Sequence, residues 1–272
     1  MLTSTATPPL NLLGATEVSS SVNLFGIQGE AGTGKSFAAL SFPKPVVMDY
    51  DKKVPPKEVV GIPFLITVPF YSDNFIHEIM GTKPPLQANR KLATIKWLRK
   101  EAVKLTADYT LVLDSYTIGI DNMHNLFVLN NQALFVNRDG AYDGYKAFND
   151  KLLFNIELFA VLKSLDCTVV VIFHEQIARN EKGQPTGKYR PLCTGQFKDQ
   201  ICGHFGTLLR QTKTNEGEHW WSVKSDSYFN AMVSPCYQIP ADVKRIRSSY
   251  DSLQQYRISH LVSGETQQTN KP

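Results

Sequence analysis

One stretch near the N-terminus has the residue types and the spacing of a phosphate-binding loop. Residues 29–36 read Gly-Glu-Ala-Gly-Thr-Gly-Lys-Ser and fit the pattern G-x-x-x-x-G-K-[ST] at every fixed position. Glycines let the backbone curl around a phosphate, Lys35 can reach the β- and γ-phosphates, and the Ser36 hydroxyl can ligate Mg²⁺. The motif therefore predicts a nucleotide site. The expected nucleotide-binding residues are Gly29, Glu30, Ala31, Gly32, Thr33, Gly34, Lys35, Ser36 and Phe37.

The residues on either side of this loop predict the elements that would position it. The apolar run 22–27 is typical of a strand, and residues 37–40 can open a helix. Strand, loop and helix in this order are the context in which the motif binds phosphate, because the helix N-terminus adds positive potential there. A chance glycine-rich turn would lack this context.

A second strand end carries carboxylates that suit the same chemistry. Residues 46–49 form a short apolar strand, and Asp51 lies just past its carboxyl end, where ligands bind in open parallel sheets. Asp51 could polarise the water that attacks a γ-phosphate, or it could be a solvated loop acid. For Asp49 we expect the solvated role.

Two more strands end in polar residues. Residues 109–114 form an apolar strand that ends in Asp114, which would hold Mg²⁺ opposite Ser36. Residues 167–173 are a continuous run rich in β-branched side chains, which predicts a central buried strand. The residues that follow, His-Glu-Gln at 174–176, would lie beside the phosphate-binding loop. One of them could sense a γ-phosphate, or the group could be satisfied inside the core.

A basic segment follows this strand. Residues 179–195 lack periodicity and contain several glycines and prolines, so we expect a long loop. Its cations and its aromatic ring suit single-stranded nucleic acid, which offers phosphates and stacking faces. A solvated surface loop is the alternative. The candidate DNA-binding residues in it are Arg179, Lys182, Lys188, Tyr189 and Arg190.

The remaining pattern predicts an α/β chain. We expect Ile156 and its neighbours at helical spacing to face the core, and the basic face of the helix at 89–105 to be solvated. The other expected elements are a strand at 62–68, helices at 118–134 and 142–165, a hairpin formed by 205–212 and 219–224, and a basic helix at 241–256.

Composition is that of an ordinary globular protein. The chain has 272 residues, of which 42% are hydrophobic, and a formal net charge of +4, which permits an acidic partner without requiring one. Four cysteines without C-x-x-C spacing predict reduced thiols, and no run suits a membrane span or a signal peptide. We expect a cytoplasmic protein with a flexible arm at 1–20, a core at 21–235 and a C-terminal helix and disordered tail at 236–272.

These motifs together resemble a known family. Over about residues 22–224 the chain is similar to the RecA-like recombinase ATPases, most closely the small ones that bacteriophages encode for single-strand annealing recombination. The resemblance is carried by Met-Asp-Tyr-Asp at 48–51, Leu-Asp-Ser at 113–115 and Val-Ile-Phe-His-Glu-Gln-Ile at 171–177. It implies that ATP is the nucleotide. The catalytic residues it implies are Lys35 in the loop, Asp51 as the carboxylate, Gln176 as the switch glutamine and Lys224 as a lysine acting on the neighbouring subunit.

The resemblance also implies two DNA-binding loops. The first covers about residues 136–144 and includes Arg138, and the second starts at residue 178 and ends near residue 195. Asp51 is shorter than the glutamate usual in the family, so hydrolysis could be slow.

The expected fold is a single α/β core of the RecA-type P-loop NTPase kind, with a mainly parallel sheet, flanking helices and a C-terminal β-hairpin. The expected function is an ATP-binding and ATP-hydrolysing recombination protein that forms a ring or filament on single-stranded DNA and promotes annealing or strand pairing. ATP would lie at the subunit boundary, contacted by Lys224 or Arg210 of the next subunit, and a single-strand-binding or annealing protein could be a partner. One alternative is a helicase-like or packaging motor, and another is a nucleotide-gated scaffold for an annealing protein.

Overall fold

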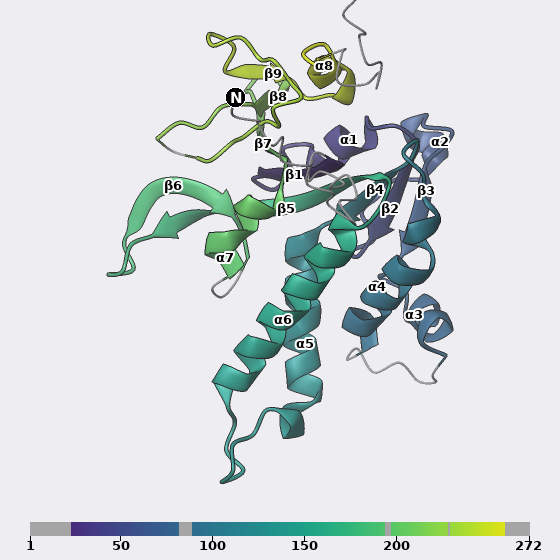
Figure 1. Cartoon of the computed structure of the whole chain (residues 1–272), viewed down its shortest axis with the longest axis vertical. Helices are drawn as coiled ribbons and strands as arrows, with labels where there is room; N and C mark the ends of the chain where they lie inside the picture. Colours follow the sequence, from purple (N-terminus) through teal and green to yellow (C-terminus); the bar gives the residue numbers. More distant parts are fainter. Residues whose placement is uncertain (1–22, 82–88, 194–196, 228, 259–272) are drawn as a thin grey trace, which may run out of the picture.

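A computed structural model describes residues 23–81, 89–193, 197–227 and 229–258 (Figure 1). The strands of this part of the chain form one sheet in the order β3-β2-β4-β5-β1-β7-β8-β9, with β6 paired to β5 off this path. The strands are β1 (Leu24–Gly29), β2 (Pro45–Asp49), β3 (Ile66–Pro69), β4 (Thr110–Asp114), β5 (Thr168–Arg179), β6 (Pro185–Pro191), β7 (Thr207–Lys213), β8 (His219–Ser222) and β9 (Arg245–Arg247).

The sheet is mainly parallel. Strands β3, β2, β4, β5, β1 and β7 run parallel to their neighbours, and β8 and β9 continue the sheet antiparallel. Strand β5 lies between β1 and β4, so the carboxyl ends of β1, β4 and β2 lie beside the middle of β5, which continues past them. In this register Gly29 pairs with His174, and Asp49 pairs with Asp114. The polar residues at these three strand ends therefore lie at one edge of the sheet, next to the polar residues of β5.

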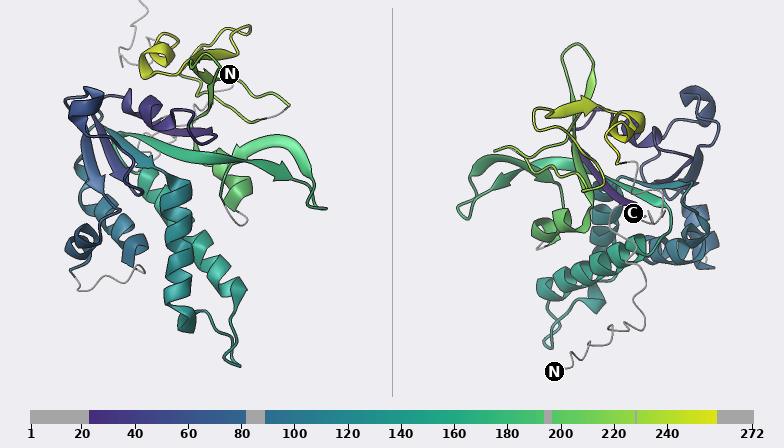
Figure 2. Two further views of the ribbon diagram at one scale, coloured as in Figure 1. Left: turned by 180° about the vertical axis from the view of Figure 1, so that it is seen from behind. Right: turned by 45° about the horizontal axis from the view of Figure 1, so that its top comes forward.

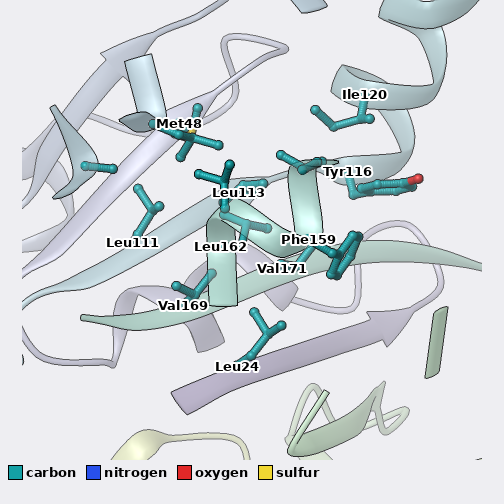
Figure 3. Packing of buried hydrophobic residues seen from close by; sticks show 14 of the residues in the cluster. Leu24, Met48, Leu111, Leu113, Tyr116, Ile120, Phe159, Leu162, Val169 and Val171 are labelled. Atoms are coloured by element: carbon teal, nitrogen blue, oxygen red, sulfur yellow. The ribbon is translucent and has the colours of Figure 1, made fainter. Parts of the chain in front are cut away.

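Helices cover both faces of the sheet (Figures 1 and 2). Successive side chains of a strand point to opposite faces, and on β5 Val169 and Val171 enter one buried cluster while Val170 enters the other. Figure 3 shows the first cluster, in which Phe159 and Leu162 of α6 pack against the sheet. The helices are α1 (Lys35–Leu40), α2 (Lys57–Val60), α3 (Asp73–Met80), α4 (Asn89–Lys100), α5 (Asn122–Asn130), α6 (Gly144–Lys163), α7 (Phe197–Gln200) and α8 (Tyr250–Gln254).

The prediction of a long loop at 179–195 is wrong. Strand β5 continues to Arg179 and β6 pairs back on it as a hairpin, which extends to one side of the sheet (Figure 1). The turn is closed by Asn180, whose side-chain oxygen accepts from the backbone N–H groups of Lys182 and Gln184. Asn180 and, three residues later, Gly183 with its positive φ are residue types that favour a tight turn. The other glycines and prolines of the segment concealed this signal.

Three other expectations need correction. The basic helix at 241–256 is strand β9 followed by the short helix α8, and both pack on the core through Ile246 and Leu253. The helix at 118–134 is a π-helical turn, α5 and a 3₁₀ turn. On α6, Ile156 is 48% exposed rather than core-facing.

The expected arm at 1–20 and the polar tail at 264–272 lie outside the described residues. Within the described residues, none of the helices is both long enough and apolar enough to cross a membrane. All four cysteines are free thiols.

Candidate nucleotide-binding site

The loop between β1 and α1 has a conformation that only glycine accommodates easily. Gly32 and Gly34 have φ values of 79° and 87°, in the left-handed region. A Cβ atom on Gly34 would lie 2.8 Å from the His219 ring, and a Cβ atom on Gly29 would lie 2.5 Å from the carbonyl oxygen of Gln211. The spaced glycines of the motif are thus required by both backbone geometry and close packing.

Residues far away in sequence hold this loop in place. The Thr33 carbonyl accepts hydrogen bonds from Gln211 Nε2 at 3.0 Å and from His219 Nδ1 at 2.7 Å. A carbonyl only accepts, so Nδ1 of His219 carries the proton. Gln211 is fixed in turn by the Ser248 hydroxyl, which donates to its Oε1 atom at 2.7 Å. Nothing in the local sequence marks these residues, because Gln211 reaches the loop through the pairing of β7 with β1, and His219 through the pairing of β8 with β7.

Lys35 lies inside the loop. Its ammonium donates to the carbonyls of Gly29 at 2.9 Å and Glu30 at 2.6 Å, and the residue is buried. Burial lowers the pKa of Lys35, and the charges of Asp114 and Glu175 oppose that shift. A phosphate chain would offer the ammonium stronger, charged acceptors than these two carbonyls.

The two predicted metal ligands meet. The Ser36 hydroxyl lies within reach of the Asp114 carboxylate, and Asp114 is 7% exposed. Burial raises the pKa of Asp114 to about 6, while the Ser36 hydroxyl opposes this shift and the charges of Asp51 and Asp49 add to it. A divalent cation would remove the cost of burying this carboxylate beside other acids, so the donor set fits Mg²⁺.

The described residues hold no group of three or more His, Cys, Asp or Glu side chains arranged as a metal site. Magnesium bound with a nucleotide does not need one, because phosphate oxygens and water complete its coordination. Ser36 and Asp114 are therefore enough protein ligands.

The acids at the end of β2 and in the turn after it are not solvated loop residues. Asp49 is 1% exposed, and its Oδ1 atom accepts the backbone N–H groups of Asp51 and Lys53, each at 3.3 Å. Burial raises the pKa of Asp49, and these two N–H groups oppose the shift. The expectation for Asp49 was wrong, because it supports the turn that carries Asp51. The Asp51 side chain is 14% exposed and pairs with Lys53 at 2.7 Å.

The polar residues at 174–176, which lie within β5, have different surroundings. His174 lies level with Gly29, and burial together with the charges of Lys35 and Lys53 lowers its pKa. The carboxylate of Glu175, which is 2% exposed, receives two hydrogen bonds of 2.8 Å from Arg210.

The Arg210 guanidinium also stacks on two rings. Its Cζ atom lies 4.3 Å from the ring centre of Tyr189 and 5.1 Å from that of Phe229. The expectation that Arg210 reaches a neighbouring subunit is therefore wrong, since both its charge and its planar faces are engaged within its own chain.

Comparison with protein families agrees with this geometry. A family model described as an AAA domain matches residues 23–232. The chain belongs to this AAA-domain family. It thus has a P-loop ATPase-type domain, and the use of a nucleotide and Mg²⁺ is general for that type of domain. No curated protein matches the chain significantly.

Within the AAA domain, the other two predicted catalytic residues lie in different surroundings. Gln176 is half-buried on β5, two residues beyond His174, and pairs with Arg190 in the β5–β6 ladder. Lys224 follows β8 and donates to the Pro240 carbonyl of its own chain. Their catalytic roles stay predictions.

The predicted DNA-binding residues occupy two separate projections of the AAA domain. Arg179, Lys182 and Lys188 are exposed on the β5–β6 hairpin, where the Arg179 guanidinium donates to the Gly183 carbonyl at 2.7 Å. Tyr189 and Arg190 are half-buried at its base. Arg138 is exposed in the segment that connects α5 and α6. This connection lies away from the β5–β6 hairpin in Figures 1 and 2.

Proposed function

We propose that this AAA-domain protein is a RecA-like ATPase, of the kind that phages use in recombination, which assembles on single-stranded DNA and promotes annealing or strand pairing. The observation that carries the proposal is the path of β5. This single strand holds His174 level with the phosphate-binding loop, and it continues into the basic hairpin, with an irregular register between Ile177 and Arg179. In the proposal, a change at the loop is transmitted along this strand to the hairpin.

The ATPase part of the proposal assigns chemical roles to four residues of the site. Asp51 accepts a proton from water, the water oxygen bonds to the γ-phosphorus, and the bond to the β–γ bridging oxygen breaks to give ADP and phosphate. Ser36 and Asp114 would hold Mg²⁺, which would supply positive charge beside the phosphates. Lys35 binds the β- and γ-phosphates.

The DNA part rests on the charge and shape of the hairpin. Between Arg179 and Arg190 the chain has four cations and one acid, Glu181. A two-stranded projection with exposed cations at its tip can follow a phosphate backbone, and the hairpin base offers the Tyr189 ring.

The assembly part rests on Lys224. In the proposal this lysine contacts the γ-phosphate held by the neighbouring subunit, which requires it to leave the Pro240 carbonyl. ATP would thereby favour the assembled state over free subunits, because only the assembled state offers this contact.

The first test is steady-state ATP hydrolysis with and without single-stranded DNA, with Lys35→Ala as the control. We expect hydrolysis that DNA stimulates and that the substitution abolishes. Tight ATP binding without any effect of DNA would contradict the recombinase proposal.

The second test replaces the hairpin cations Arg179, Lys182 and Lys188 with alanine. The matched control replaces Lys96, Lys100 and Lys104 of the α4 region, which removes the same charge from another exposed surface. Each phosphate contact to single-stranded DNA adds about 0.7 to the steepness of the plot of log K for DNA binding against log salt concentration. Loss of the three cations should therefore reduce the steepness of this plot by about 2. An equal loss in the control variant would show that binding follows net charge and not the hairpin.

A nucleotide-gated scaffold for an annealing protein is the second candidate. It is favoured by the pairing of Asp51 with Lys53, since the Asp51 oxygen that contacts the Lys53 ammonium is not free to contact a water molecule. In that case the protein binds ATP with little turnover, and Lys35→Ala abolishes binding of the annealing partner.

A further inference from the structure

The turn that follows β2 brings one cation to the proposed catalytic acid. Asp49 accepts the backbone N–H groups of Asp51 and Lys53, and Lys52 between them adopts a left-handed φ of 60°. This turn directs both side chains to the same place, and the Lys53 ammonium lies 2.7 Å from Oδ2 of Asp51. The backbone of the turn thus holds the two side chains where they can form an ion pair.

The two partners differ sharply in exposure. The Asp51 side chain is 14% exposed, whereas that of Lys53 is 65% exposed. The other oxygen of Asp51, Oδ1, is buried without a hydrogen-bond partner. A purely structural ion pair would satisfy both oxygens of a buried carboxylate, so one orphaned oxygen indicates a site that is incomplete without a ligand.

The turn that carries Lys53 follows β2, at the same edge of the sheet as the phosphate-binding loop that carries Lys35. Burial is the main cause of the lowered pKa values of Lys35 and His174, and the charge of Lys53 adds to both shifts. Two ammonium groups at the edge where β1, β2 and β4 end are an arrangement suited to a polyanion. The adjacent Lys52 is used differently, since its ammonium lies 5.8 Å from the ring centre of Tyr71.

We propose that Lys53 is a second phosphate-binding lysine, whose ammonium leaves Asp51 for the γ-phosphate of the bound triphosphate. Asp51 is then free to accept the proton of the attacking water. This inference rests on the proposed ATPase function and adds to it a residue that senses the γ-phosphate from within the same subunit. With a diphosphate, Lys53 stays on Asp51 and holds the acid inactive.

The decisive measurement is the ratio of affinities for a non-hydrolysable ATP analogue and for ADP, both with Mg²⁺, by titration calorimetry. Loss of one charge-assisted contact to phosphate corresponds to about a tenfold loss of affinity. Lys53→Ala should therefore weaken the ATP analogue about tenfold and leave ADP unchanged, because ADP lacks the group that Lys53 binds. Lys53→Arg, which keeps the charge, should restore most of the preference.

Two controls separate this role from others. Lys52→Ala removes a neighbouring lysine of the same turn and should leave both affinities unchanged. Asp51→Asn removes the acid, and in that background Lys53→Ala should still weaken the ATP analogue if Lys53 touches the γ-phosphate. Melting temperatures of all variants show separately whether leaving the largely buried Asp51 without its cation destabilises the fold, and the affinity ratio is compared at temperatures where each variant is folded.

If Lys53→Ala weakened the binding of the ATP analogue and of ADP equally, the assignment of Lys53 would be overturned. The same holds if Lys52→Ala weakened binding of the ATP analogue as much as Lys53→Ala does. An effect that disappears in the Asp51→Asn background would also overturn it, because Lys53 would then act only through the acid. If the wild-type protein binds both nucleotides but does not hydrolyse ATP, the ATPase proposal fails, while the affinity ratio still decides the role of Lys53.

Discussion

The Arg210–Glu175 pair gives a prediction about stability that can be worked out from the structure. Arg210 on β7 reaches across the end of β1 to Glu175 on β5, and both of its hydrogen bonds to the carboxylate are 2.8 Å long. The side chains are 15% and 2% exposed. Arg210→Ala would leave a buried carboxylate without its counter-charge and would remove the guanidinium that stacks on Tyr189.

Removing one partner of a buried ion pair costs about 3–5 kcal/mol, because the remaining charge is left uncompensated. Since Arg210 keeps some contact with solvent, we expect the lower end, about 3 kcal/mol. With a urea dependence of about 3 kcal/mol per molar, the unfolding midpoint should fall by about 1 M. Replacing both partners by neutral residues, as in Arg210→Met with Glu175→Gln, should recover much of this loss.

Urea unfolding followed by circular dichroism measures this effect. Lys213→Ala is the matched control, because it removes an exposed cation from the same strand. Hydrogen exchange should also accelerate at residues 185–191 in Arg210→Ala, since the Tyr189 ring loses its stacking partner. A stability loss no larger than that of the control, or equal losses in the single and double variants, would refute the reasoning.

Two further predictions concern the loop and a buried histidine. Gly34→Ala should abolish nucleotide binding in a direct titration, since its Cβ atom would lie 2.8 Å from the His219 ring, whereas Gly32→Ala meets nothing within 4 Å and should cost only about 1 kcal/mol of stability. Burial lowers the pKa of His124 from 6.5 to about 4, so only the unfolded state gains a proton at first as the pH falls. This difference in the pKa of His124 between the two states contributes about 3 kcal/mol to the free energy of unfolding. The contribution should be complete above about pH 6.5 and lost toward pH 4. His124→Gln, whose amide can still donate to the Ala147 carbonyl, should lack this part of the pH dependence of urea unfolding; an unchanged profile would contradict it.

Some features of the site could be read from local sequence. The glycines, Lys35 and Ser36 act through backbone geometry within eight residues, and the strand that ends in Asp114 is marked by its own apolar run. The parallel sheet with helices on both faces follows from apolar strands alternating with amphipathic helices. Such patterns suffice because each depends on neighbours in the chain.

Other features could not be found in this way. Gln211 and His219 bind Thr33 from 178 and 186 residues away, and nothing in their own segments distinguishes them from other polar strand residues. The hairpin at 179–191 was concealed because glycines and prolines, which usually interrupt a strand, here lie on an exposed edge where ladder hydrogen bonds can be missed.

The sequence by itself determined the phosphate-binding loop, the strand that carries Asp114 and the basic character of the segment after β5, because these depend on residue type and short-range spacing. Only the tertiary structure decided the order of the strands. That order places β5 between β1 and β4 and β7 beside β1, so that Arg210 is committed to Glu175 and Asp114 meets Ser36. Strand order is a property of the whole chain, since each pairing is selected by how completely all the strands together bury their apolar faces.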